Sequence, residues 1–175
     1  MNRKFSIGRR AQDSHTYNGF TLMELLIVMA IIAILMLIAI PTVGGLKKYA
    51  NDLSARASVR AIFQAEMQYD STYPANGYAC SLATLGGDPS AGAPAATAAQ
   101  MLQPDLASGS KSGYLFNVAN CTKVTINGTD RYTGYTITAV PQTLGKTGDR
   151  GYCSDQFGTI KFDPAGGTNC SQPLQ

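Results

Sequence analysis

The chain has little of what enzymes and metal sites use. It contains no Trp and a single His, His15, and only 14% of its 175 residues are charged. None of its four Cys forms a Cys-x-x-Cys pair, so zinc ligation has no supporting spacing. Gly145-Lys146-Thr147 resembles the end of a phosphate-binding loop but lacks the required glycine, because Val140 stands at that position. The sequence therefore predicts neither an enzyme nor a bound cofactor.

Positive charge is also scarce outside the N-terminal segment. The formal net charge is +3. Beyond residue 20, ten Lys and Arg balance ten Asp and Glu, so the excess lies in residues 1–19, as Arg3, Lys4, Arg9 and Arg10 against Asp13. Nucleic-acid binding requires a basic surface that displaces counterions. A neutral body therefore predicts no nucleic-acid partner.

Four cysteines lie in the C-terminal half, at Cys80, Cys121, Cys153 and Cys170. An even number of cysteines downstream of an export segment indicates two disulfides formed in an oxidising compartment. Three connectivities are possible. The shortest loops favour Cys80–Cys121 and Cys153–Cys170.

One long apolar run, residues 20–40, contains a single charge, Glu24. At about 1.5 Å per residue, a helix of this length spans a hydrocarbon core of about 30 Å. A cleavable signal peptide has a shorter apolar region and a small-x-small cleavage site, which this run lacks. A simple membrane anchor fits the length, with the basic leader staying cytoplasmic. Neither alternative explains Glu24.

A lone carboxylate within a membrane span costs several kcal/mol and is functional by default. Its partner should be a cation at the same depth, and residues 20–40 contain no Lys or Arg. Cleavage between Gly19 and Phe20 would create an ammonium only four residues from Glu24. This amine could pair with Glu24 of the same helix, or with that of a staggered neighbour.

Residues 19–28, GFTLMELLIV, resemble the class III signal of type IV pilins and type II secretion pseudopilins. The resemblance implies that a prepilin peptidase cuts after Gly19, removing the 1–19 leader, and N-methylates Phe20. Glu24 matches the glutamate that is implied to neutralise the terminal amine of an adjacent subunit. Pro41 matches the family's proline within the same helix.

A weak point follows the apolar run. Pro41 should end or kink the first helical segment, residues 20–45, because it lacks a backbone donor and clashes with the preceding turn. Gly44 and Gly45 each cost about 1 kcal/mol in a helix interior. The resemblance implies that this segment melts on filament assembly, whereas a plain kink at the membrane surface is the alternative. An amphipathic helix is expected at 46–70, with one apolar stripe from Leu46 to Ala65 and another through Val59, Phe63 and Met67.

The rest of the chain predicts a loop and then a sheet. Residues 71–112 are rich in Ala, Gly, Ser and Pro, with short helices expected at 81–85 and 96–102. Residues 113–175 form the head, with strands at 114–118, 123–126, 132–139, 151–154 and 159–162 and a hairpin turn at Asn127-Gly128. The predicted fold class is α+β. The resemblance implies the type IV pilin fold, a long N-terminal helix, transmembrane in its first half, packed on an antiparallel sheet.

Three acids, Asp149, Asp155 and Asp163, lie close in sequence and are weak candidates for a cation such as calcium. Ordinary turn and solvated acids are the simpler interpretation. No metal site is predicted.

The leading functional hypothesis is a structural subunit of a type IV pilus. It predicts self-polymerisation, a peptidase, a pilus or secretion assembly platform, and membrane lipid before assembly as partners. The precursor is expected in a bacterial inner membrane and the product outside the cell. The alternatives are a pseudopilin of a periplasmic type II secretion filament and a membrane-anchored periplasmic binding or enzymatic domain.

Overall fold

A computed structural model describes residues 19–174, apart from the side chains of residues 38–43. The predicted 1–19 leader lies outside the described residues except for Gly19, and the side chain of Pro41 lies outside them too. The chain divides into two compact units, Met1–Ile40 and Pro41–Gln175.

Helix α1 (Leu22–Thr72) has 51 residues and contributes to both units. It continues through Pro41, Gly44 and Gly45 without a break. An interior proline removes one hydrogen bond, and the long flanking helical segments tolerate that loss. An end of the helix at Pro41 is therefore excluded for the described chain, whereas a kink and melting on assembly stay predictions.

In the first unit, the apolar side chains of α1 are uncovered, from Leu22, 80% exposed, to Leu37, 76% exposed. Taken over the described residues, none of the helices combines the length and the hydropathy expected of a membrane-crossing helix. The membrane span expected at residues 20–40 stays a prediction.

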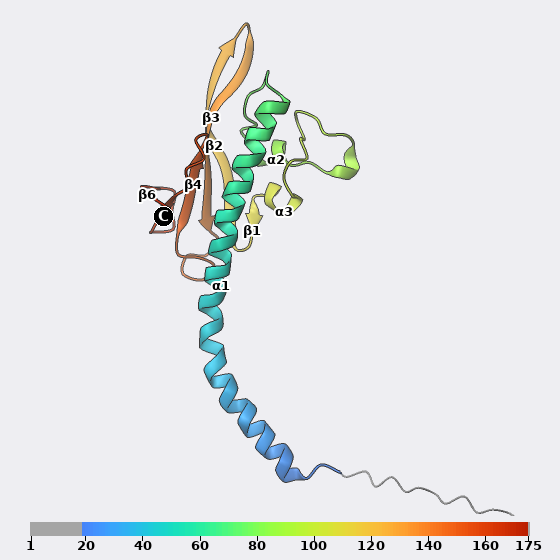
Figure 1. The fold of residues 1–175 in the computed structure, drawn as a ribbon, viewed down its shortest axis with the longest axis vertical. Helices are drawn as coiled ribbons and strands as arrows, with labels where there is room; N and C mark the ends of the chain where they lie inside the picture. The colour runs from blue at the N-terminus through green and yellow to red at the C-terminus, as the bar shows by residue number, and fades with distance from the viewer. Residues whose placement is uncertain (1–18, 175) are drawn as a thin grey trace, which may run out of the picture. The chain divides into compact units, whose positions relative to one another are not determined.

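The second unit contains one six-stranded antiparallel sheet beside the C-terminal half of α1 (Figure 1). Each strand pairs with the next along the chain, in the order β1 (Ser110–Lys111), β2 (Tyr114–Ile126), β3 (Thr129–Pro141), β4 (Gly151–Asp155), β5 (Lys161–Asp163) and β6 (Gln172–Pro173). The short β1 and β6 are edge strands without a distinct sequence pattern. The α+β class and the helix packed on an antiparallel sheet are confirmed.

Strand β2 replaces two predicted strands. Residues 114–118 and 123–126 join through a register irregularity between Ala119 and Thr122, where Asn120 has a φ of 52°. A bulge of this kind keeps a strand continuous while bending it. The predicted Asn127-Gly128 turn is confirmed, because both residues have positive φ and Ile126 pairs with Thr129.

The loop between helix and sheet carries α2 (Leu82–Leu85), a 3-10 turn η1 (Pro89–Ala91) and α3 (Pro104–Ala107). The short helix predicted at 81–85 corresponds to α2, but the helix predicted at 96–102 is wrong. Ala99 and Met101 donate backbone hydrogen bonds to α2, and Gln100 between them has a φ of 55°. Pro104 begins α3 instead, since proline is favoured at the first helical position.

The core of the second unit lies between α1 and the sheet. The buried face of α1 is a single stripe, Ala55, Val59, Ile62, Ala65 and Tyr69. It packs in one cluster with sheet residues such as Tyr114, Ile137 and Tyr152. The two predicted apolar stripes coincide with this buried face only in part, because Leu46, Leu53 and Met67 are exposed.

Candidate functional site

The segment before α1 presents an accessible peptide bond. Gly19 and Phe20 precede the helix and have no regular secondary structure. The Phe20 side chain is 90% exposed, and nothing lies within 4 Å of the position that a Cβ on Gly19 would occupy. The bond between these two residues is therefore open to an approaching enzyme.

Thr21 and Glu24 cap the N-terminus of α1 reciprocally. The Glu24 amide donates to Thr21 Oγ1 at 3.2 Å, while the Thr21 amide and hydroxyl both donate to Glu24 Oε2 at 2.9 Å. This is a capping box, which satisfies orphan donors at a helix start. Sequence reasoning missed it, although the spacing Thr-x-x-Glu is its signature.

The capping box changes the interpretation of Glu24. Its carboxylate has neutral local donors from Thr21 in this structure, and its pairing with a new terminal amine stays a prediction. Both donors go to Oε2. Glu24 is an exposed residue, and Oε1 is the carboxylate oxygen that the cap does not use.

Both disulfides have the pairing that short loops favour. Cys80 pairs with Cys121 across a Cα–Cα distance of 6.0 Å, and Cys153 pairs with Cys170 across 5.9 Å. The first bond ties the loop before α2 to the bulge of β2. The second ties β4 to the segment before β6. Together they hold the two least regular parts of the head on the sheet.

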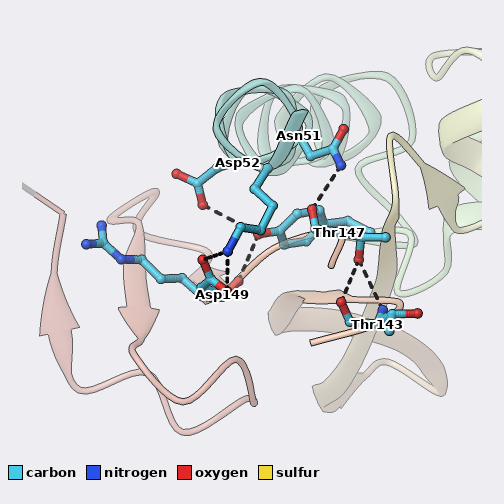
Figure 2. Close-up of polar contacts among 8 residues, drawn as sticks. Asn51, Asp52, Thr143, Thr147 and Asp149 are labelled. Atoms are coloured by element: carbon cyan, nitrogen blue, oxygen red, sulfur yellow. Dashed lines mark hydrogen bonds and ion pairs between the residues drawn. The ribbon is translucent and has the colours of Figure 1, made fainter. Parts of the chain in front are cut away.

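A polar cluster joins α1 to the loop between β3 and β4 (Figure 2). Asn51 donates to the Thr147 carbonyl at 2.9 Å, and Lys48 Nζ lies 2.9 Å from Asp149 Oδ2. Thr147 in turn closes its own loop by exchanging hydrogen bonds with the Thr143 backbone. The loop is thus fixed against the helix by side chains from both elements.

Asp52, on α1 next to Asn51, accepts hydrogen bonds from two tyrosine hydroxyls. Tyr114 and Tyr152 both donate to its Oδ1, while Arg56 donates to its Oδ2 at 3.0 Å. Burial, followed by the charge of Asp52, raises the pKa of Tyr114 to about 12. Both tyrosines therefore stay neutral donors, which suits a structural anchor.

The three acids considered for calcium do not converge. Asp149 pairs with Lys48, and Asp155 accepts from the Phe157 amide at 3.0 Å. Asp163 accepts from the amides of Ala165 and Asn169 at 2.9 and 3.1 Å. No three His, Cys, Asp or Glu side chains are grouped for a metal ion within residues 19–174. In this structure the three acids form an ion pair and accept turn hydrogen bonds.

Glu66 is a buried carboxyl that sequence reasoning missed. It is 0% exposed, and its Oε2 accepts from the Ala79 amide at 2.7 Å. Burial outweighs the backbone hydrogen bonds and raises its pKa from 4.5 to about 7. Glu66 follows Ile62 by four residues, and this spacing places both on the same face of a helix. The sequence could therefore have indicated that Glu66 faces the core.

Residues 15–40 match a family model described as the prokaryotic N-terminal methylation motif. No curated protein and no solved structure gives a significant match. The motif implies a membrane-anchored precursor, processed by a prepilin peptidase and assembled into a pilus-type polymer. The chain thus carries, around its Gly19–Phe20 bond, the signature of the type IV pilins and pseudopilins, which are structural subunits in general.

Proposed function

We propose that this chain is a prepilin, the structural subunit of a type IV pilus filament. It is cut after Gly19, N-methylated at Phe20, held in the inner membrane by residues 20–40, and polymerised by helix packing. One observation carries the proposal. The methylation motif covers residues 15–40, where an uncovered apolar helix holds the lone carboxylate of the segment, Glu24, in its first turn.

Glu24 sets the register between subunits in this proposal. Packing the apolar helices together removes water from their surfaces, and a carboxylate among them requires compensation. Thr21 supplies neutral donors to Oε2, and the N-terminal amine of a neighbouring Phe20 supplies the cation to Oε1. The contact is heterologous, because the carboxylate of one subunit meets the terminus of the next. Such contacts do not close and build an open helical filament.

Two variants separate intersubunit pairing from local capping. Glu24→Ala removes both functions, whereas Thr21→Val removes the hydroxyl contacts and leaves the carboxylate. We expect Thr21→Val to assemble filaments in electron micrographs and Glu24→Ala to give none, with both variants resisting alkaline extraction from membranes. Equal loss of filaments in the two variants would show that Glu24 acts only as a helix cap.

A pseudopilin of a type II secretion system is the second candidate. The Tyr73-Pro74 junction, directly after the end of α1, resembles that of major pseudopilins. The terminal loop bounded by Cys153 and Cys170 favours a pilin instead. Filament length distinguishes the two, because a pilin gives long surface filaments that shear into the medium. A pseudopilin at native expression gives none.

A further inference from the structure

Charge is distributed unevenly over the second unit. We use the name basic end for residues 44–60 of α1 together with residues 142–150, the loop between β3 and β4. The basic end contains six Lys and Arg against two Asp, a net charge of +4. The rest of residues 41–175 contains four Lys and Arg against seven Asp and Glu, a net charge of −3.

The two parts of the basic end lie together in the fold. Lys48 pairs with Asp149, and Asn51 donates to Thr147, so the loop is fixed against the start of this half of α1 (Figure 2). Between helix and loop lies an open cleft of about 340 Å³, lined among others by Lys48, Arg56 and Arg150. Three cationic side chains and the carboxylates of Asp52 and Asp149 therefore border one concave surface, with one cation in excess.

Much of this charge is not neutralised within the chain. Lys48 and Arg56 each have a carboxylate partner, Asp149 and Asp52. Among the described residues, the ion pairs include none for Lys47, Arg60, Lys146 or Arg150. The Arg150 guanidinium lies 5.0 Å from the centre of the Phe162 ring, a contact that leaves its charge intact. The basic end thus retains positive charge for an external anion.

Apolar and aromatic side chains accompany the charge. Leu46 is 66% exposed and Tyr49 is 62% exposed on the helix, and Leu144 is 60% exposed on the loop. Basic heads beside exposed leucine and tyrosine are typical of surfaces that lie at a membrane interface, where rings and alkyl stems enter the headgroup layer. An acidic protein partner would need the charge but not these three uncovered side chains.

We propose that the basic end binds anionic phospholipid headgroups on the outer surface of the membrane that holds the subunit before assembly. This inference rests on the proposed anchor at residues 20–40. Lys47 is seven positions beyond Ile40 along the chain. A helix covers this separation in about 10 Å, which places Lys47 at the outer edge of the polar layer, since that layer is about 5–8 Å thick on one side of a bilayer. The Lys47 and Lys48 ammonium groups therefore lie within reach of lipid phosphates, and Arg150 lines the same cleft as Lys48.

Docking would hold the head against the membrane until the subunit is extracted. Each basic side chain near an anionic surface contributes about a fivefold change in the ratio of docked to undocked heads. The contact weakens with salt, since the screening length falls to about 3 Å at 1 M. A subunit that enters a filament must give up this lipid contact. A membrane richer in anionic lipid therefore retains the subunit more strongly.

The absence of Trp from the chain makes the test direct. Full-length Tyr49→Trp is reconstituted into vesicles of brominated phosphatidylcholine, with or without phosphatidylglycerol. We expect the fluorescence of the introduced indole to be quenched when the anionic lipid is present. Molar salt should reverse this quenching. Phe157→Trp, at a 79% exposed turn elsewhere in the unit, is the matched position and should stay unquenched. Adding Lys47→Gln and Arg150→Gln to Tyr49→Trp should lower the docked ratio about 25-fold, whereas Lys123→Gln with Lys161→Gln should not.

Three outcomes would overturn the proposal, and they have different meanings. Equal indole fluorescence of the Tyr49→Trp variant with and without phosphatidylglycerol, in a chain that resists alkaline extraction, would leave the anchor intact and remove the lipid contact. A change in indole fluorescence that depends on subunit density in pure phosphatidylcholine would show that the basic end binds the acidic surface of a second copy instead. Release of the chain by alkali would refute the anchor itself, and the lipid contact with it.

Discussion

Glu66 predicts a specific pH dependence of head stability. Its carboxyl is fully buried on the core face of α1, with a pKa raised from 4.5 to about 7 by burial. Oε2 accepts from the Ala79 amide, whereas Oε1 and the hydroxyl of Tyr135 are among the buried atoms without a hydrogen-bond partner in the described chain. The folded head therefore holds the proton more tightly than the unfolded chain does.

The sign of the effect follows from that difference. Below pH 4.5 the carboxyl is protonated in both states, and its contribution to stability is fully present. Between pH 4.5 and about 7 the unfolded chain loses the proton first, so the free energy of unfolding falls as the pH rises. The slope approaches 1.4 kcal/mol per pH unit, and the total loss is about 3 kcal/mol. Above about pH 7 the contribution is constant again.

Glu66→Gln isolates this term because the amide keeps an oxygen acceptor for Ala79 and does not titrate. We expect the variant to lose the decline between pH 4.5 and 7 that the natural chain shows. Urea unfolding followed by the near-ultraviolet circular dichroism of the tyrosines measures both curves. The exposed Asp88→Asn is the matched control and should keep the decline. Parallel curves for the natural chain and Glu66→Gln would refute the assignment of this term to Glu66.

Three further predictions concern the fold. Replacing Cys153 and Cys170 by Ser should lower the free energy of unfolding in urea by about 3 kcal/mol, because the disulfide closes a loop of 17 residues. Replacing Cys80 and Cys121 should lower it by about 4 kcal/mol, because that loop spans 41 residues. An unchanged free energy of unfolding would contradict the disulfide concerned. Gly148→Ala should cost about 1–3 kcal/mol, because a Cβ there overlaps the Tyr114 hydroxyl. An unchanged urea midpoint would argue against that packing. Gly44→Ala and Gly45→Ala meet nothing within 4 Å and should each stabilise local helix by about 1 kcal/mol. Amide hydrogen exchange at residues 44–48 should then slow about fivefold, and unchanged exchange would contradict a weak point there.

The sequence predicted the features that depend on local chemistry. The Asn127-Gly128 turn follows from two residues that tolerate positive φ, and the disulfide pairing follows from loop length. Helix α2 appears where it was expected. The class of fold needed only the order of a long helical pattern followed by alternating strands.

Features that depend on partners elsewhere in the chain could not be predicted from local sequence. Residues 96–102 have helical composition, but their backbone bonds to α2, which lies earlier in the chain. The buried side of α1 is selected by the sheet, so Glu66 is enclosed while Leu46 and Leu53 are exposed. Asp149, Asp155 and Asp163 are close in sequence, yet Asp149 pairs with Lys48 on α1, whereas Asp155 and Asp163 accept from backbone amides two residues on. The Thr21–Glu24 capping box, by contrast, depends only on local spacing and is readable from Thr-x-x-Glu at the start of the helix.

If this chain is a processed, polymerising subunit, the mass of the mature protein carries the mark of that processing. Filaments sheared from cells and analysed by intact mass spectrometry should give a subunit that begins at N-methylated Phe20 and contains two disulfides. A filament subunit, or a membrane-bound product, with an intact Gly19–Phe20 bond would contradict the account.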